Sequence, residues 1–315
     1  MSLRLATFGL YSVLFSALAC AQRVPGDVRI DDTAVFPESI TSTPDGTLYA
    51  GSVKGNVYRA APSSNTAIPW IRHSPENGIL TILGVLADQA SNTLWLCSAP
   101  NSFGPERSAG VTALMAFDLA SGMQKGRYDF PAPAGVCNDI AVAADGTAFA
   151  SDTGNGRIFM LAPGASELVL FGSDPALVGI DGLAFSSDGI LYVNNVRSNQ
   201  LIRVARNNDG TMGALTILKL SLQLGGPDGL RLLDGNRFIQ AEGTIGRIHI
   251  AEVEGDTATI AVLDDSLVSS PGVTVVGNTA YALESNIQYL LDPKLKSQQP
   301  DAFWIKAIAL PENNK

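Results

Sequence analysis

Four short stretches of the sequence carry an oxygen-bearing side chain shortly before a turn. The stretch Pro227-Asp228-Gly229-Leu230 is the clearest of them, and similar stretches surround Glu38, Asn138 and Asp181. Carboxylate and carboxamide oxygens are the ligands that hard cations prefer. If the four stretches occupy equivalent places in a cyclic repeat, their side chains converge on one axis and form a cation site.

A turn-forming pair recurs between apolar segments about every 43 to 54 residues, which indicates a repeat architecture. Such pairs favour tight hairpin turns. Because each repeat contains four short strand-like segments, we expect an all-β fold, a six-bladed β-propeller with four-stranded antiparallel blades, formed by residues 23–315 as a single domain. The segment near residues 27–31 offers a further strand for the last blade. The six pairs are Asp45-Gly46, Ser91-Asn92, Asp145-Gly146, Asp188-Gly189, Asp234-Gly235 and Gly277-Asn278.

Counting back from the turns places the four polar residues at one level of the repeat. Glu38, Asn138 and Asp181 each lie seven residues before the Asp of their turn, and Asp228 lies six residues before its turn. The innermost strands of a propeller line its central channel, so residues at their starting ends gather at one mouth. Since side chains alternate along a strand, Asn138 and not Asp139 is expected to point into this mouth.

The second strand of each blade runs antiparallel to the first, so its far end returns to the same mouth. Asp152 and Asn195 hold this place in the third and fourth repeats, and we expect them to contact substrate, with capping of strand ends as the alternative. The loop of residues 98–110 is longer than the matching loops and carries Arg107. Arg107 is a candidate to contact an anionic ligand, and an exposed insertion is the alternative. The equivalent residues of the other repeats are Ser52, Ser98, Glu242 and Glu284.

Three carboxylates beside one carboxamide repel each other in a partly desolvated channel unless a cation is present. We therefore expect one divalent cation, calcium before zinc, manganese or magnesium. The alternative without metal is that these residues recur only because the fold recurs. Turn chemistry explains the Asp of each Asp-Gly pair. It does not explain Glu38 and Asp228, which follow prolines upstream of the turns.

The composition narrows the classes of function. With 46% hydrophobic and 16% charged residues, the chain has enough apolar side chains for a large core. Its net charge of −9 argues against a nucleic-acid partner. Only two histidines are present, and we expect His249 to be structural within an apolar strand and His73 to lie on the surface. A Ser-His-Asp hydrolase is therefore not supported.

Residues 1–22 have the pattern of a secretory signal peptide. Arg4 precedes an apolar segment from about Leu5 to Leu18, and small residues suited to cleavage follow. That segment is short for a membrane span, so we expect a secreted or periplasmic protein without a membrane span. A lipidated Cys20 is the minor alternative.

Cys97 and Cys137 remain after cleavage of such a peptide. We expect them to be two small buried hydrophobic side chains. A disulfide between them is the alternative, which an oxidising compartment permits.

The four stretches together resemble the gluconolactonase and senescence-marker family, the regucalcin-like and luciferin-regenerating-enzyme-like six-bladed propellers. The resemblance covers nearly the whole chain after residue 22, and the order and register of the motifs make it more specific than any single one. The motifs are Phe36-Pro37-Glu38-Ser39, Cys137-Asn138-Asp139-Ile140, Ile180-Asp181-Gly182-Leu183 and Gly226-Pro227-Asp228-Gly229-Leu230.

The resemblance implies a divalent cation held by Glu38, Asp181 and Asp228, with Asn138 near the substrate. Asp181 stands where the family pattern has Asn, which adds negative charge. Val136 stands where sugar-lactonase members can carry Arg, so the substrate need not be a sugar lactone.

The activity that the resemblance implies is opening of a lactone, a small-molecule cyclic ester, by metal-activated water. A cation would polarise the lactone carbonyl and stabilise the oxyanion. Asp228 would act as the general base, and Asn138 would orient the substrate. The alternatives are a non-catalytic propeller that binds a ligand or a protein, and a strictosidine-synthase-like enzyme.

Overall fold

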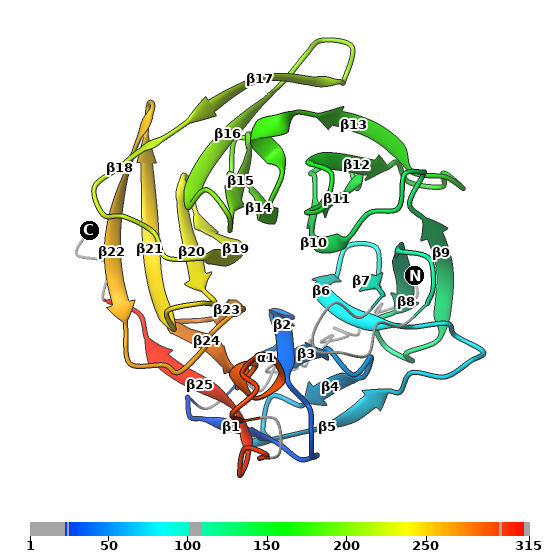
Figure 1. Ribbon diagram of the computed structural model, residues 1–315, viewed down its shortest axis with the longest axis vertical. Coiled ribbons are helices and arrows are strands. Elements are labelled where there is room, and N and C mark those ends of the chain that lie inside the picture. The colour runs from blue at the N-terminus through cyan, green and yellow to red at the C-terminus, as the bar shows by residue number, and fades with distance from the viewer. Residues whose placement is uncertain (1–22, 24, 101–108, 296–297, 312–315) are drawn as a thin grey trace, which may run out of the picture.

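The computed structural model describes residues 23, 25–100, 109–295 and 298–311. Its strands succeed one another around a central channel (Figure 1). Each group of four antiparallel strands forms one blade, with the first strand at the channel and the last at the outside. The six-bladed propeller predicted from the repeat is therefore confirmed.

The blades follow the chain in order. Blade 1 contains β2 (Pro37–Ser42), β3 (Leu48–Ser52), β4 (Val57–Ala60) and β5 (Thr66–Ile71). Blade 2 contains β6 (Thr81–Asp88), β7 (Thr93–Ala99), β8 (Ala113–Asp118) and β9 (Gln124–Asp129). Blade 3 contains β10 (Cys137–Val142), β11 (Ala148–Asp152), β12 (Arg157–Leu161) and β13 (Val169–Ser173), and a 3-10 turn, η1 (Pro175–Leu177), follows it.

The second half of the ring repeats this plan. Blade 4 contains β14 (Ile180–Phe185), β15 (Leu191–Asn195), β16 (Gln200–Arg206) and β17 (Met212–Ile217). Blade 5 contains β19 (Pro227–Asp234), β20 (Arg237–Glu242), β21 (Arg247–Glu254) and β22 (Thr257–Asp264), with the short strand β18 (Lys219–Leu220) beside β22. Blade 6 contains β23 (Val273–Val276), β24 (Thr279–Glu284), β25 (Phe303–Ala309) and β1 (Val28–Ile30), and the short helix α1 (Gln288–Leu291) lies between β24 and β25.

The two ends of the described chain meet in blade 6. β1 pairs antiparallel with β25, where Val28 lies opposite Ile305. β1 also pairs parallel with β5 and so joins blade 6 to blade 1 in one eight-stranded sheet (Figure 1). The expectation that residues near 27–31 add a strand to the last blade is confirmed.

The six predicted turn pairs each connect the first and second strands of a blade. Gly46, Gly146 and Gly189 have φ values of 90°, 84° and 83°, a left-handed region that glycine adopts without steric cost. The turns therefore fix the register from which the positions of the channel residues were counted.

Apolar side chains fill the spaces between neighbouring blades. For example, the ring of Phe149 in blade 3 lies 5.1 Å from that of Phe185 in blade 4, and 5.2 Å from that of Phe171 within its own blade. At the channel the inner strands come still closer, because a Cβ atom on Gly182 would lie 2.3 Å from the carbonyl oxygen of Asp228. This contact brings the starting ends of β14 and β19 together.

Cys97 on β7 and Cys137 on β10 form a disulfide that links blades 2 and 3, with their Cα atoms 5.1 Å apart. The expectation of two unbridged hydrophobic side chains was therefore wrong. The strands near the axis converge, and this brings two residues of adjacent blades within bonding distance.

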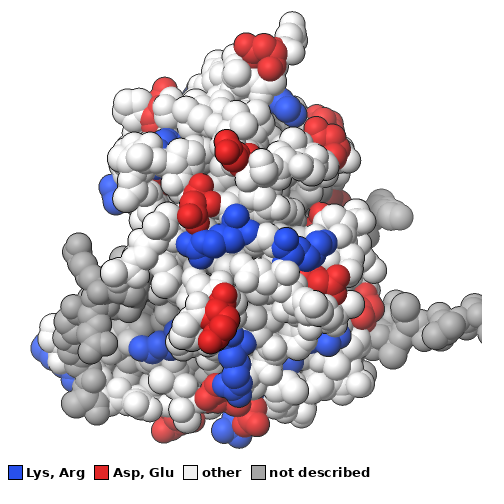
Figure 2. Space-filling model, turned by 90° about the vertical axis from the view of Figure 1, so that its right-hand side faces the viewer, with Lys and Arg blue, Asp and Glu red and all other residues white. Residues whose placement is uncertain are grey.

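Several expectations fall outside the described residues, namely the signal peptide at 1–22, the lipidated Cys20 and Arg107. Among the residues that the structure describes, no helix is long and apolar enough to cross a membrane. On the side of the ring seen in Figure 2, Lys and Arg side chains stand beside Asp and Glu side chains, without a broad basic surface.

Candidate functional site

Glu38, Asn138, Asp181 and Asp228 all occupy the second position of an inner strand, in β2, β10, β14 and β19. Glu38, Asn138 and Asp181 are 6%, 8% and 5% exposed. Since the inner strands start at the same end of the channel, the structure brings the four predicted residues to one mouth. We call these four side chains the acidic ring.

A β-bulge lies at this position in five of the inner strands, β2, β6, β10, β14 and β19. In β10, for instance, the register with β11 shifts between Cys137 and Ile140. A bulge leaves a residue unpaired and changes the direction of its side chain. Simple alternation along the strand is therefore not what aims Asn138 and Asp139.

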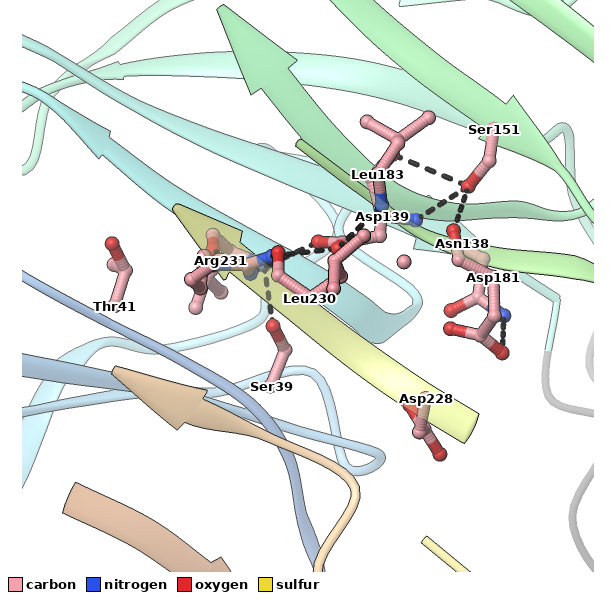
Figure 3. A network of polar contacts seen from close by, with 12 residues as sticks. Ser39, Thr41, Asn138, Asp139, Ser151, Asp181, Leu183, Asp228, Leu230 and Arg231 are labelled. Atoms are coloured by element: carbon pink, nitrogen blue, oxygen red, sulfur yellow. Dashed lines mark hydrogen bonds and ion pairs between the residues drawn. The ribbon is translucent and has the colours of Figure 1, made fainter. Parts of the chain in front are cut away.

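Direct contacts join three members of the acidic ring. The amide Nδ2 of Asn138 donates to Asp181 Oδ2 at 2.8 Å (Figure 3). It also donates to Thr153 Oγ1 at 3.0 Å. The carboxyl groups of Asp181 and Asp228 also share a hydrogen bond, which raises the pKa of Asp228 and lowers that of Asp181. Glu38 interacts with both carboxyl groups through their charge.

Burial is the largest cause of the pKa shifts in the acidic ring. It raises the pKa of Glu38 well above its usual value, and repulsion from Asp181 and Asp139 raises it further. Burial and the charge of Asp139 raise the pKa of Asp181 to about 7. For Asp228, burial followed by the charges of Asp181 and Glu38 raises the pKa in the same way. The ring therefore resists carrying its full negative charge unless a counter-charge is present.

Arg231 and Asp139 form an ion pair that the sequence did not reveal. Arg231 Nη1 and Nη2 donate to the two carboxylate oxygens of Asp139 at 2.6 and 3.0 Å. The same guanidinium donates to the carbonyl oxygens of Leu230 at 2.8 Å and Val85 at 3.3 Å, so it reaches from blade 5 to blades 2 and 3 (Figure 3). The available signal was a single arginine within the apolar run Leu230-Arg231-Leu232-Leu233.

This ion pair leaves the acidic ring without full compensation. Asp139 contributes to the raised pKa values of Glu38, Asp181 and Asp228, whereas Arg231 lowers those of Glu38 and Asp181. Four carboxyl groups thus interact around one guanidinium. In charge and in ligand type the ring fits a hard divalent cation. As the side chains stand, however, no three His, Cys, Asp or Glu residues in the described part of the chain are arranged to hold a metal ion.

The structure does not place Asp152 in the acidic ring. Its side chain is fully buried and accepts hydrogen bonds from the backbone amide of Val136 at 2.9 Å and from Arg157 Nε at 2.6 Å. Asn155 Nδ2 donates to it at 3.0 Å. These partners hold the loop before β10, so the contacts of Asp152 favour the alternative that it caps a strand end.

Asn195 has the same role in blade 4. Its Nδ2 donates to the carbonyl oxygens of Ala176 and Val178 at 3.0 and 3.1 Å, and its Oδ1 accepts from two backbone amides at 3.0 Å. With 1% exposure it is closed off from the channel. Because its hydrogen-bonding atoms are already used, the contacts of Asn195 also favour the capping alternative.

Glu242 extends this pattern to blade 5. Its carboxylate accepts from Arg247 Nε and lies 2.9 Å from Nδ1 of His249, and both Glu242 and His249 are fully buried. We call Asp152, Asn195 and Glu242 the anchor ring. The structural role expected for His249 is confirmed, and His73 is exposed as expected.

The channel is hollow at the end opposite the acidic ring. A cavity of about 890 Å³ lies there, lined by the later residues of β6, β10 and β14, by the turns that follow these three strands, and by Arg231 and Leu232 of β19. Arg231 lines this cavity and, on its other side, is paired with Asp139. The ion pair therefore stands between the cavity and the acidic ring.

Comparison with known families and curated proteins gives one partial match. The family model described as strictosidine synthase-like, N-terminal, matches residues 18–60, a segment that includes Glu38. No curated protein matches the chain.

Solved structures match over nearly the whole chain. A gluconolactonase from Xanthomonas campestris is 18% identical, with 95% of this chain and 94% of that chain covered and a TM-score of 0.65. A luciferin-regenerating enzyme is 12% identical, with 91% and 98% covered and a TM-score of 0.65. The allergen Mala s 1 from Malassezia sympodialis is 13% identical, with 90% and 96% covered and a TM-score of 0.69. At these identities the similarity shows the fold, and the predicted resemblance to gluconolactonase-like propellers is confirmed at that level.

Proposed function

We propose that the protein is a secreted, divalent-metal-dependent hydrolase that opens a lactone. The observation that carries this proposal is the acidic ring, in which three buried carboxyl groups repel one another at one mouth of the channel. Perturbed carboxyl groups of this kind cluster at functional sites. The gluconolactonase among the similar structures supports the same reaction class.

Glu38, Asp181 and Asp228 would hold the cation, calcium first and zinc, manganese or magnesium as alternatives. When bound, the cation would supply a Lewis acid for the carbonyl oxygen of the ester. Binding requires the three side chains to turn from their present positions, since they are not arranged to hold a metal ion as they stand.

Asp228 would remove the proton from the attacking water, because its carboxyl group lies at the mouth and its raised pKa makes it a stronger base than an ordinary carboxylate. Asn138 would orient the substrate from the neighbouring strand β10. Thr153 and Asp181 fix the amide of Asn138 by accepting from its Nδ2, so its orientation is set before a substrate enters. Such preorganisation is what catalytic positioning requires.

The test combines hydrolysis of aldonolactones and aliphatic lactones with thermal melting. We expect divalent cations to raise the melting temperature and to support hydrolysis, and EDTA to reverse both effects. Glu38→Gln should lower kcat/KM at least about 100-fold and remove the cation-dependent shift in melting temperature. Glu252→Gln, on the exposed face of β21, is the matched control and should change neither. Hydrolysis by Glu38→Gln at the parent rate would refute the mechanism.

A strictosidine-synthase-like reaction is the second candidate. It is favoured by the family model that matches residues 18–60. It predicts condensation of an amine with an aldehyde and no hydrolysis of lactones. Assaying both reactions with the same preparation separates the two candidates, and absence of both favours a non-catalytic binding propeller.

A further inference from the structure

The cavity at the turn end of the channel has a volume, about 890 Å³, that falls in the usual range for small-molecule sites. It lies away from the acidic ring and takes no part in the proposed hydrolysis. Its wall is formed by the inner strands of blades 2 to 5, which are held in place by the same inter-blade packing that holds the ring. The cavity is therefore a second hollow of the channel, distinct from the acidic ring.

The wall of this cavity is apolar. Leu86, Val142, Phe185 and Leu232 line it, together with alanines of the same strands. Leu232 is 38% exposed, which is unusual for a leucine on the innermost strand of a blade. An apolar surface of this kind gains free energy when a ligand removes it from water.

Carboxylates surround the apolar wall at the turns. Asp88, Asp145 and Asp188 each line the cavity, from blades 2, 3 and 4. Each accepts a hydrogen bond within its own turn, as Asp145 does from the amide of Thr147 at 2.9 Å. A carboxylate has about four lone-pair sites, so each keeps further acceptor capacity. The guanidinium of Arg206, which does not line the cavity, helps to lower the pKa of Asp145 through its charge.

The only basic residue that lines the cavity within the described residues is Arg231, at the end nearest the acidic ring. Both of its terminal nitrogens are occupied by Asp139, with side-chain exposures of 13% and 4% for Arg231 and Asp139. Its charge is therefore neutralised, and the cavity as a whole is negative. A ligand that carries a positive charge on an apolar body matches both features.

We propose that this cavity binds a small organic cation, an amine with an apolar aliphatic or aromatic body. The body lies against Leu86, Phe185 and Leu232, and the ammonium group lies among the carboxylates at the turns. The same three charges disfavour an anion of the same shape. The site is independent of the lactonase proposal, because none of its lining residues belongs to the acidic ring.

The test uses three probes of one shape, 3-phenylpropylamine, 3-phenylpropanol and 3-phenylpropionate, with binding measured by calorimetry and by ligand-observed NMR. We expect the amine to bind at least about ten times more tightly than the propionate, with the affinity of the alcohol between them. The affinity of the amine should fall as salt is added. Equal binding of amine and propionate, or no binding of the amine, would overturn the proposal.

Two variants locate the site. Leu232→Arg places a positive charge at an exposed position of the wall and should weaken amine binding at least about tenfold. Ile217→Arg, at a 49% exposed position on the outer strand β17, is the matched control and should leave binding unchanged. Asp188→Asn, which keeps the shape of the turn residue, should weaken binding about threefold and serves if Leu232→Arg does not fold.

Asp228→Asn separates this cavity from the acidic ring. If the amine binds in the turn-end cavity, its affinity is unchanged in Asp228→Asn. If Asp228→Asn removes binding while Leu232→Arg keeps it, the amine binds at the acidic ring and the proposal is wrong. Neither outcome depends on whether the protein hydrolyses lactones.

Discussion

The acidic ring and the anchor ring lie at the same end of the blades, yet their polar groups have opposite environments. Asp152 of the anchor ring accepts hydrogen bonds from Arg157 and from the backbone of its own loop. Asp181 of the acidic ring accepts from Asn138 but otherwise faces other carboxyl groups. In blades 3 to 5 the last residue of the second strand therefore stabilises the fold, whereas the second residue of the first strand is left available for a ligand.

The two rings also differ in the direction of their pKa shifts. Although burial alone would raise it, hydrogen bonds from His249 and Arg247 and from the Gly225 amide lower the pKa of Glu242 to about 2. In Asp181 burial and the charge of Asp139 prevail, and the pKa rises to about 7. Burial by itself does not identify a functional carboxylate. The balance between burial and compensating donors does.

The largest expected effect is on the anchor ring. Asp152→Ala removes the carboxylate that pairs with the buried guanidinium of Arg157 and leaves Nε of Arg157 and the amide of Val136 without their acceptor. We expect the free energy of unfolding to fall by about 3–5 kcal/mol, measured by urea denaturation. Asp129→Ala, which removes an exposed ion pair with Arg127, should change it by about 1 kcal/mol or less. A small effect of Asp152→Ala would show that its contacts are not stabilising and would remove the contrast between the rings.

The matching change in the acidic ring should have the opposite sign. Asp181→Asn removes a buried charge that repels its neighbours, so in EDTA at pH 8 we expect the free energy of unfolding to rise by about 1–3 kcal/mol. Because the family pattern has Asn at this position and a carboxamide oxygen can still hold a cation, the same variant should keep a smaller stabilisation by divalent cations. Urea denaturation with and without calcium measures both effects. A loss of stability comparable to that of Asp152→Ala would mean that Asp181 is another anchor.

Both rings should contribute to the pH dependence of stability. Per pH unit, we expect each contribution to the free energy of unfolding to be smaller than the effects of the two substitutions, about 1 kcal/mol or less. Glu242 has a folded pKa of about 2 against an ordinary value of 4.5, so its stabilisation is present above pH 4.5 and is lost as the pH falls towards 2. Asp181 has a folded pKa of about 7 against an ordinary value of 3.8, so in EDTA the protein should lose stability as the pH rises from about 4 through 7.

Melting temperatures measured across this pH range locate two limbs, the acidic limb where stability falls as the pH falls, and a second limb where stability falls as the pH rises towards 7. Glu242→Gln should flatten the acidic limb, and Asp181→Asn should flatten the limb at higher pH. Added calcium should flatten the second limb only, since a bound cation supplies the missing counter-charge. If the melting temperature in EDTA rises steadily from pH 4 to 8, the acidic ring is not the strained region that we describe.

The sequence alone predicted the ring of six blades and the end of the channel at which the candidate site lies. Asp-Gly turns such as Asp145-Gly146 mark each blade, and counting from them placed Glu38, Asn138, Asp181 and Asp228 at one mouth. Local turn geometry and strand length determine these features, so they can be read from a single chain. The bulges that aim the side chains depend on the pairing partner and were not visible.

Contacts between distant blades were the part that the sequence did not disclose. Arg231 reaches Asp139, 92 residues away in the chain, and nothing in the period of the repeat specifies such a partner. An oxygen at a strand end suits capping and substrate binding equally well, so the sequence leaves both roles open for Asp152 and Asn195. Only the presence of Arg157 and of the loop carbonyls near them decides between the two roles.

The closure of the ring by β1 has a consequence for how the chain reaches its native state. Val28 finds its partner Ile305 only after the intervening blades have formed or can fold back, so this pairing has very high contact order. Loop entropy grows slowly with length, and the seam therefore costs little more in free energy than a shorter closure. Its cost is in time, because an early strand must wait for the last one. We expect the seam between blades 6 and 1 to form last and to open first under denaturant, well before the inner strands that carry the acidic ring separate.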